Sequence, residues 1–327
     1  MSLRIGIIGT GGIARHHIAA LKNIPDAHVA AIAGRNTNRT RELSALTGAA
    51  AYEDYHEMLK KENLDAAFIL LPPHAHGEVE KACAEHVGAV MIEKPVCQNL
   101  EQADQISKMF KAAGTIVSVA YMMRYHKSVE RARSVFKNDR PALVTGRWIT
   151  PLPSPSWWRK KQLSGGQFVE QCTHLVDAAR YIVGEIVTVS AFGATGFVND
   201  VPDYDVFDAM TVNVLFDSGA VGNFSLGCFP RKSYEKRDVG LYIASRDVRC
   251  QFSGWGMELD LEHSDGAAEH FDEAGGGIFE AEDAAFLDAV RRHDPSLIRS
   301  SYDDAVRTLG VTLAANESRV RHRTVLL

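Results

Sequence analysis

Lys94 stands where a lysine can do chemistry. It follows Glu93 and a short apolar run, Ala89–Ile92, and it precedes Pro95. Such a run predicts a buried parallel strand, and open α/β sheets bind their ligands outside the carboxyl ends of their strands. A flexible cation at a partly desolvated strand end favours a role on a substrate or cofactor. Lys94 is therefore the first catalytic candidate.

A second polar cluster falls on a helix expected over residues 167–183. Glu170, His174, Asp177 and Tyr181 are spaced i, i+4, i+7 and i+11, which places them on one helix face. An ordinary amphipathic helix also has such a polar face, turned to solvent. This one lacks lysine and has an acid about one turn from His174 on each side, which can fix the imidazole tautomer and tune it as a base. We favour the functional interpretation.

A glycine-rich segment, Gly9 to Ala14, matches G-x-G-x-x-A between a predicted strand and a predicted helix. Glycines permit the tight turn and let backbone amides approach a pyrophosphate, which the positive end of the helix stabilises. We expect a nicotinamide dinucleotide here. Its expected contacts in this segment are Gly9, Thr10, Gly11, Gly12 and Ile13.

The end of the second strand bears on the choice between NAD and NADP. NAD is favoured by a carboxylate that accepts from the ribose, whereas NADP requires a cation near its 2′-phosphate. The segment 33–39 has no acid and contains Arg35 and Arg39. We therefore expect NAD or NADP with a preference for NADP, although both arginines would also suit a solvated helix entry.

The first 121 residues alternate strands with helices. Six strands are expected in a doubly wound parallel sheet, and five can be placed, at 3–8, 28–33, 66–71, 89–92 and 116–119. Asp54 is expected to cap one helix, and Asn99, with Gln102 as its capping-box partner, another. This region is the predicted Rossmann domain.

Residues 122–327 follow another pattern. Period-two alternation, as at 210–216, predicts strands with one covered face, and Asp217-Ser218-Gly219 and Ser245-Arg246-Asp247 predict hairpin turns. Helices are expected at 128–138, 280–293 and 302–319. The prediction is an α+β domain with a large open, mostly antiparallel sheet.

Composition narrows the class of protein. The chain has 327 residues, more than one core usually supports, with 46% apolar and 24% charged residues and a net charge of −5. This charge gives no reason to expect nucleic acid. Five scattered cysteines form no C-x-x-C pair, which argues against disulfides and zinc, and Cys83 and Cys97 are expected to be buried. Without a membrane-spanning stretch or signal peptide, a cytoplasmic location is expected.

Together these motifs resemble the family of glucose-fructose oxidoreductase, inositol dehydrogenase and the rhizopine catabolism protein MocA (Gfo/Idh/MocA), over nearly the whole chain. The matching segments are Gly9 to Ala14, Leu71-Pro72-Pro73-His74-Ala75-His76, Glu93-Lys94-Pro95, Arg124-Tyr125, Gly165-Gly166 leading to His174, and Ala314 to Ser318.

The resemblance implies how the site works. It implies that Lys94 lies beside the nicotinamide and the reacting oxygen, and that His174 transfers the proton. It also implies a homodimer or homotetramer formed through the second sheet. Glu170 stands where the family more often has aspartate, and Cys172 where it has glycine, so a familiar sugar substrate does not follow.

The expected reaction is hydride transfer between the nicotinamide and a secondary carbinol or ketone of a sugar, inositol or related polyol. His174 takes the hydroxyl proton, Lys94 stabilises charge on the same oxygen, and Glu170 or Asp177 orients His174. The further cofactor contacts are Leu71, Pro72, His76, Glu93 and Lys94. The expected substrate contacts are Arg124, Trp157, Trp158, Arg159 and His174, although Arg124 would also suit pairing with an acid. His74 and His76 are not expected to bind metal.

Two other functions stay open. One is an NAD-dependent glycosidase that acts through transient oxidation and turns over without net change in nicotinamide absorbance. The other is a dinucleotide-binding regulator without turnover, against which the presence of both Lys94 and His174 argues.

Overall fold

The computed structural model describes residues 2–232, 238–272 and 277–327, and its contacts divide the chain into two compact units. The first unit comprises residues 1–122 and 277–306, and the second comprises 123–276 and 307–327. Residues 277–306, which the sequence pattern assigns to the second domain, belong with the first unit because Phe286 and Leu287 are buried in the same core cluster as Phe68.

The first unit is built on a six-stranded parallel sheet, as predicted. Its strand order is β3-β2-β1-β4-β5-β6, with the reversal between β1 and β4 that characterises dinucleotide-binding sheets. The strands are β1 (Leu3–Ile8), β2 (Ala27–Ala33), β3 (Ala50–Tyr52), β4 (Ala66–Ile69), β5 (Ala89–Ile92) and β6 (Ile116–Val119). The strand that the sequence pattern did not place is β3, which has three residues at the edge of the sheet.

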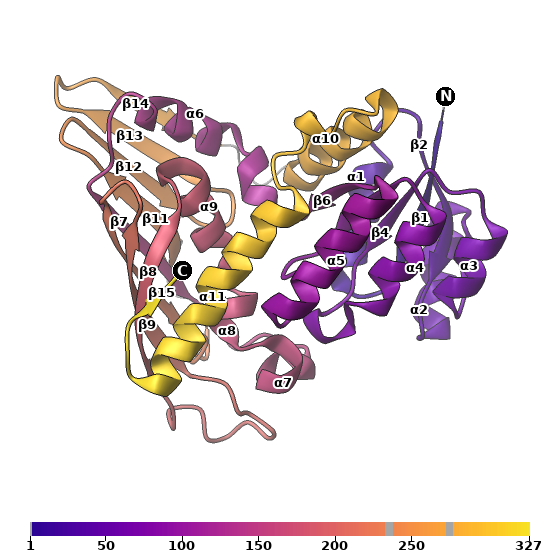
Figure 1. Cartoon of the computed structure of the whole chain (residues 1–327), viewed down its shortest axis with the longest axis horizontal. Helices are drawn as coiled ribbons and strands as arrows, with labels where there is room; N and C mark the ends of the chain where they lie inside the picture. Colours follow the sequence, from indigo (N-terminus) through magenta and orange to yellow (C-terminus); the bar gives the residue numbers. More distant parts are fainter. Residues whose placement is uncertain (1, 233–237, 273–276) are drawn as a thin grey trace. The chain divides into compact units, whose positions relative to one another are not determined.

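Helices cover this sheet. They are α1 (Gly12–Leu21), α2 (Thr37–Thr47), α3 (Tyr55–Lys61), α4 (Glu78–His86), α5 (Leu100–Ala113) and α10 (Ile278–Arg292), with short 3₁₀ turns at η1 (Pro73–Ala75) and η5 (Pro295–Leu297). Helices α3, α4 and α5 form one layer, and α1 packs against α10 (Figure 1). Central strand residues such as Phe68 and Met91 are fully buried, and each such side chain contributes roughly 1.5–3 kcal/mol through apolar burial.

The predicted helix caps at Asp54 and Asn99 are confirmed, but the predicted role of Gln102 is wrong. Asp54 accepts from the backbone of His56, and Asn99 accepts from the backbone of Gln102. The side chain of Gln102 does not complete a capping box as expected. Its Nε2 instead donates to the carbonyl of His76 at 2.9 Å, because the loop before α4 lies within its reach. Gln102 thus ties α5 to a predicted cofactor loop.

The second unit is built on a nine-stranded, mostly antiparallel sheet, as predicted. Its order is β14-β13-β12-β11-β7-β10-β9-β8-β15, and among these described strands only β7 and β10 pair parallel. The strands are β7 (Leu143–Ile149), β8 (Ile186–Ala194), β9 (Ala209–Phe216), β10 (Val221–Gly227), β11 (Val239–Ala244), β12 (Val248–Ser253), β13 (Glu258–His263), β14 (Ala268–Phe271) and β15 (Val325–Leu326). The predicted turns at 217–219 and 245–247 connect antiparallel neighbours.

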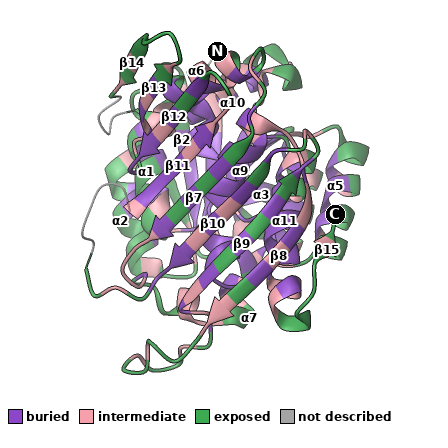
Figure 2. Ribbon diagram, turned by 90° about the vertical axis from the view of Figure 1, so that its left-hand side faces the viewer, coloured by how far each residue is buried: buried purple, intermediate pink, exposed green. Residues whose placement is uncertain are grey.

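Helices cover one face of this sheet. The helices of this unit are α6 (Lys127–Phe136), α7 (Lys161–Ser164), α8 (Gln167–Glu170), α9 (Thr173–Val183) and α11 (Tyr302–Arg321), with 3₁₀ turns at η2 (Met122–Tyr125) and η3 (Ser156–Arg159). Of these, α7 packs against η3 and α8. Figure 1 shows α6, α9 and α11 along one side of the sheet, and Figure 2 shows its other face, where buried and exposed residues alternate along the strands. This alternation follows the period of two that a half-covered sheet requires.

The single helix expected over residues 167–183 is wrong in detail. It is interrupted between α8 and α9 at Gln171 and Cys172. The amide of Cys172 donates to the carbonyl of Gln167, one residue beyond the normal helical partner. Glu170 and His174 therefore lie on opposite sides of an irregular turn, and simple helical spacing does not set their relation.

Candidate active site

The glycine loop after β1 has the space that a dinucleotide needs. Gly9 has a φ of 113°, and a Cβ there would lie 2.3 Å from the carbonyl oxygen of Leu70. Close packing thus requires glycine at that position. At Gly11 and Gly12 a Cβ would meet nothing within 4 Å, so these two glycines leave open space beside the start of α1. No side chain caps this helix and its first turn has no acid, as is typical of helix starts that bind phosphate groups.

The end of β2 carries positive charge. Gly34 packs against Thr10, and Asn36 caps α2 by accepting from the amide of Arg39 at 3.1 Å. Arg35 and Arg39 are both exposed. Among the residues that the structure describes, no acid pairs with either guanidinium.

The loop after β4 holds a buried histidine–glutamate pair. His76 and Glu80 lie 2.5 Å apart from Nδ1 to Oε1, with both side chains fully buried. The other oxygen of Glu80 accepts from the amide of Gly77. This loop follows Leu70, whose amide donates to the carbonyl of Ile8 at 2.8 Å, so Leu71 and Pro72 stand beside the glycine loop at the same edge of the sheet.

Lys94 lies at that edge too. The amide of Glu93 donates to the carbonyl of Ile69 at 2.9 Å, and Glu93 Oε2 accepts from the amide of Lys94 at 3.0 Å. Glu93 is buried and Lys94 is half-buried, and the Lys94–Pro95 peptide bond is cis. The first unit therefore brings the glycine loop, the β4 loop and Lys94 together along the carboxyl ends of neighbouring strands.

His174 belongs to the second unit and is 5% exposed. Its ring stacks on Trp148 with centroids 5.9 Å apart, and it packs edge to face with Trp255 with centroids 5.8 Å apart. Trp148 is fully buried on β7, whereas Trp255 is half exposed. Sequence reasoning missed both. The alternation of apolar and polar residues in β7 could have predicted that Trp148 is buried. It could not have predicted the contact with His174, because that contact joins residues distant in the chain.

The polar face of the 167–183 segment is buried rather than solvated. Glu170 is 4% exposed and Asp177 is 0% exposed. Both oxygens of Asp177 accept from the Arg124 guanidinium at 2.7 Å, and Oδ1 also accepts from Thr308 at 2.8 Å. Arg124 therefore pairs with an acid inside the second unit, and Asp177 anchors α9 to the chain segment at 124.

The remaining expected substrate residues form the turn η3. Trp157 and Trp158 pack edge to face with centroids 5.3 Å apart, and both are partly exposed, as is Arg159. The side chain of Gln167, at the start of α8, donates to the carbonyl of Trp158 at 3.2 Å. This bond fixes the aromatic turn to the segment that leads to His174.

The cysteines fit no role as nucleophiles. All five cysteines are free and buried, and burial raises the pKa of the Cys97 thiol to about 11 and that of Cys250 to about 12. Buried thiols of this kind are poor nucleophiles.

In residues 2–232, 238–272 and 277–327, no cluster of three or more His, Cys, Asp or Glu side chains could hold a metal ion. No helix of the described chain is long and apolar enough to cross a membrane.

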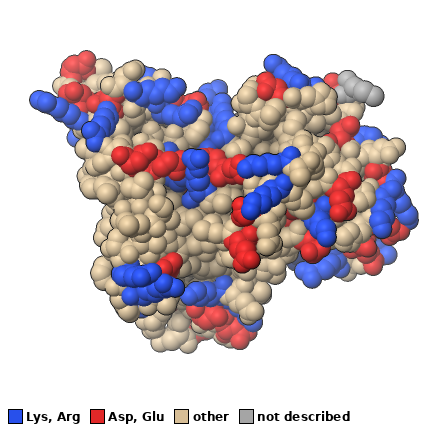
Figure 3. Space-filling model, in the orientation of Figure 1, with Lys and Arg blue, Asp and Glu red and all other residues tan. Residues whose placement is uncertain are grey.

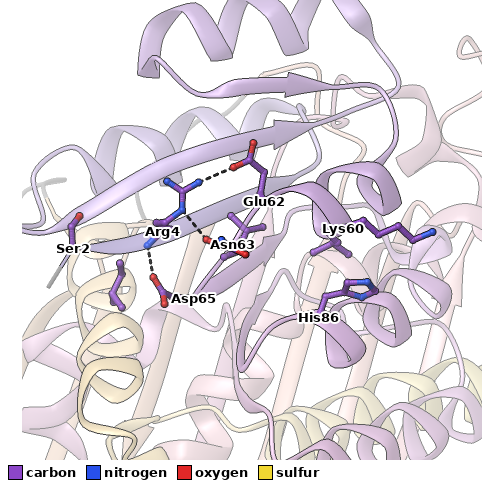
Figure 4. Close-up of a pocket in the computed structure, with 10 residues that line it drawn as sticks. Ser2, Arg4, Lys60, Glu62, Asn63, Asp65 and His86 are labelled. Atoms are coloured by element: carbon purple, nitrogen blue, oxygen red, sulfur yellow. Dashed lines mark hydrogen bonds and ion pairs between the residues drawn. The ribbon is translucent and has the colours of Figure 1, made fainter.

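A separate pocket lies at the amino-terminal edge of the first sheet (Figure 4). Its polar groups bind one another. The Arg4 guanidinium contacts Glu62 and the carbonyl of Asn63, each at 2.7 Å, and the Arg4 amide donates to Asp65. Because α/β sheets bind ligands at the opposite edge, we assign this pocket no role. Figure 3 shows acidic and basic side chains interspersed over the face of the molecule that it presents.

Comparison with known proteins identifies the family. Residues 3–121 match the oxidoreductase family with an NAD-binding Rossmann fold, and residues 128–254 match the GFO/IDH/MocA C-terminal domain. The chain is 32% identical over 225 residues to myo-inositol 2-dehydrogenase of Thermotoga maritima, covering 67% of each protein. It is 27% identical over 227 residues to scyllo-inositol 2-dehydrogenase (NAD⁺) of Bacillus subtilis, covering 68% of this chain and 66% of that protein.

Solved structures share the whole fold. Levoglucosan dehydrogenase in complex with NADH superposes with a TM-score of 0.88 at 21% identity, covering 100% of this chain and 99% of the other. The WlbA dehydrogenase of Bordetella pertussis, in complex with NADH and UDP-GlcNAcA, gives a TM-score of 0.84 at 20% identity, with 100% and 99% coverage. The two matched domains, together with the open glycine loop, show that the chain belongs to the Gfo/Idh/MocA family of NAD(P)-dependent oxidoreductases.

Proposed function

We propose that this enzyme transfers a hydride between a nicotinamide cofactor and a secondary alcohol or ketone of a sugar, inositol or related polyol. The observation that carries the proposal is the shared strand edge of the first unit, where the open glycine loop and Lys94 follow strands on either side of β4. Relatives named as inositol 2-dehydrogenases support the substrate class.

The proposed mechanism assigns one step to each residue. The nicotinamide, when bound, supplies the hydride acceptor or donor. During oxidation, His174 accepts the hydroxyl proton while the carbinol carbon gives up its hydride, which leaves a ketone. Lys94 donates a hydrogen bond to the same oxygen and stabilises the charge that develops there. We propose that Glu170 orients His174, and that Asp177 and Arg124 brace α9.

Aromatic residues are proposed to hold the substrate ring. Trp255 is half exposed and touches His174, so its free surface can stack on a polyol close to the base. Trp157, Trp158 and Arg159 are proposed as further contacts, because η3 is fixed to the start of α8.

NADP is the proposed preferred cofactor. Arg35 and Arg39 are exposed at the end of β2, where a 2′-phosphate is recognised. Leu71, Pro72, His76 and Glu93 are proposed to line the nicotinamide end. Relatives with each cofactor exist, since D-xylose 1-dehydrogenase (NADP⁺) 2 of Haloferax volcanii is 28% identical over 223 residues.

Assays with purified protein test the proposal. Sugars, inositols and sugar acids are screened at the nicotinamide absorbance with NAD and NADP, alongside product analysis. Lys94→Ala is expected to lower kcat about 10²- to 10³-fold, and His174→Ala about 10²- to 10⁴-fold. The matched control is Lys60→Ala, an exposed lysine at the opposite edge of the sheet, which should leave turnover unchanged.

Each contrary result has a distinct meaning. Undiminished turnover in Lys94→Ala refutes the mechanism. Cleavage of a glycoside without net absorbance change identifies the transient-oxidation glycosidase instead. Cofactor binding without turnover of any compound in the panel supports the regulator.

We also propose that the enzyme forms a homodimer or homotetramer through the open face of the second sheet. Leu143, Val221 and Leu215 are direct neighbours across β7, β10 and β9, and they are 44%, 51% and 39% exposed. An exposed aliphatic row of this kind favours burial against another surface. Light scattering should show an oligomer that Val221→Lys weakens, and a monomeric wild type would refute this assignment.

A further inference from the structure

A buried cluster of three ionisable side chains adjoins the backbone of Lys94 within the first unit. It comprises His17 from α1, Asp283 from α10 and Glu93 from the end of β5. His17 Nδ1 donates to Asp283 Oδ1 at 2.9 Å, and His17 Nε2 lies 3.5 Å from Glu93 Oε1. The imidazole also meets the rings of Phe68 and Phe279 edge to face. Three separate elements thus converge on one histidine.

His17 carries a positive charge at neutral pH. Burial lowers the pKa of His17, but Asp283 and then Glu93 outweigh it and raise this pKa from 6.5 to about 10. Burial acts on Asp283 in the other direction and raises its pKa against the pull of His17. Because a carboxylate faces each ring nitrogen, we take His17 as the imidazolium. The imidazolium then lies between the carboxyl groups of Asp283 and Glu93.

Packing alone does not require such a cluster. Burying each ion costs several kcal/mol, and apolar side chains of similar volume serve stability as well or better. His17 and Asp283 are both 0% exposed and Glu93 is 7% exposed, so water compensates little of this cost. The cluster is therefore better explained by what it holds in place.

The His17–Asp283 pair contacts Glu93, and Glu93 in turn binds the backbone amide of Lys94. The Glu93 amide is bound to Ile69 on β4, and its Oε1 faces His17. Its Oε2 accepts the amide hydrogen of Lys94 at 3.0 Å. The Glu93 side chain therefore lies between the His17 imidazole on one side and the Lys94 amide on the other.

We propose that the His17–Asp283 pair is a positioning device for Lys94, acting through the Glu93 carboxylate. This role rests on the proposed function of Lys94. Loosening the pair lets the Lys94 ammonium move away from the reacting oxygen, and a displacement of about 1 Å costs on the order of 10²-fold in rate. Substrate and cofactor affinity depend much less on it.

Kinetics of single and double variants test the role. His17→Gln and Asp283→Asn should each lower kcat about 10- to 100-fold, with the KM values for cofactor and substrate within about twofold of wild type. In a Lys94→Ala background, either change should lower the remaining rate less than about twofold, because the group that it positions is gone. Phe286→Leu, a core change on the same helix beside Phe68, is the control and should lower stability while leaving kcat unchanged.

The outcomes separate the two proposals. If His17→Gln and Asp283→Asn lower kcat as much with Lys94→Ala as without it, or change KM alone, the positioning role is overturned and the cluster is structural. If His17→Gln does not fold, Asp283→Asn, which keeps a hydrogen-bond acceptor beside His17, carries the test by itself. Full turnover by Lys94→Ala refutes both the proposed function of Lys94 and the positioning role. Equal losses of kcat with and without Lys94→Ala refute the positioning role alone.

Discussion

The buried pair of Arg124 and Asp177 gives the sharpest prediction for stability. The Arg124 side chain is 4% exposed and that of Asp177 is 0% exposed, and two hydrogen bonds of 2.7 Å join them. Asp177→Asn removes the negative charge but keeps the volume and a carbonyl acceptor for Thr308. The guanidinium then stays buried without its counter-ion.

The expected loss can be bounded. Removing one partner of a buried ion pair costs about 3–5 kcal/mol, because the other charge is left uncompensated. Arg124 keeps a contact with the Tyr181 ring, whose centroid lies 4.8 Å away, and this cation–π interaction offsets part of the loss. We therefore expect about 3 kcal/mol for Asp177→Asn, and a smaller loss for the double variant Arg124→Met/Asp177→Leu, which removes both charges of the pair.

Tryptophan fluorescence during urea unfolding measures the loss in the free energy of unfolding of the second structural unit. All four tryptophans, Trp148, Trp157, Trp158 and Trp255, belong to the second unit, so the signal reports that unit even if the two unfold separately. Asp200→Asn is the control, because its pair with Arg231 is exposed and should contribute no more than about 1 kcal/mol. A loss below about 1 kcal/mol for Asp177→Asn, or a double variant as unstable as the summed singles, would show that the pair does not brace α9.

Three further predictions concern the cofactor, pH and substrate. Replacing Arg35 and Arg39 by serine should lower kcat/KM for NADPH at least about 10- to 100-fold and leave that for NADH unchanged, since even one lost charged hydrogen bond is worth roughly 1.5–3 kcal/mol; equal losses with both cofactors would contradict it. Because the pKa of His17 is raised from 6.5 to about 10, its stabilising effect is complete below about pH 6.5 and is lost as pH rises toward 10. The free energy of unfolding should fall across this window by at most about 1.4 kcal/mol per pH unit, and a titration of His17→Gln with the same slope as wild type would exclude His17 as its source. Trp255→Ala should raise the substrate KM about tenfold with little change in the cofactor KM, because stacking on an exposed ring is worth about 1 kcal/mol or more; an unchanged substrate KM would remove Trp255 from the site.

Sequence by itself predicted the elements whose signals are local. The glycine loop and the alternating strands and helices indicated the doubly wound sheet. Hydrophobic alternation and turn residues likewise indicated the antiparallel sheet of the second unit. Lys94 was recognisable because a charge directly after an apolar strand is a feature of adjacent residues.

Tertiary structure decided which side chains meet. His17, Glu93 and Asp283 are separated by many residues, and only the packing of α10 on α1 brings the last of them to the first. The polar face around His174 proved buried, and Asp177 proved to bind Arg124, because residues outside the helix supply the covering surface and the counter-ion. Periodicity in a sequence tells which residues share a face. The partner of that face depends on long-range packing, which no local pattern encodes.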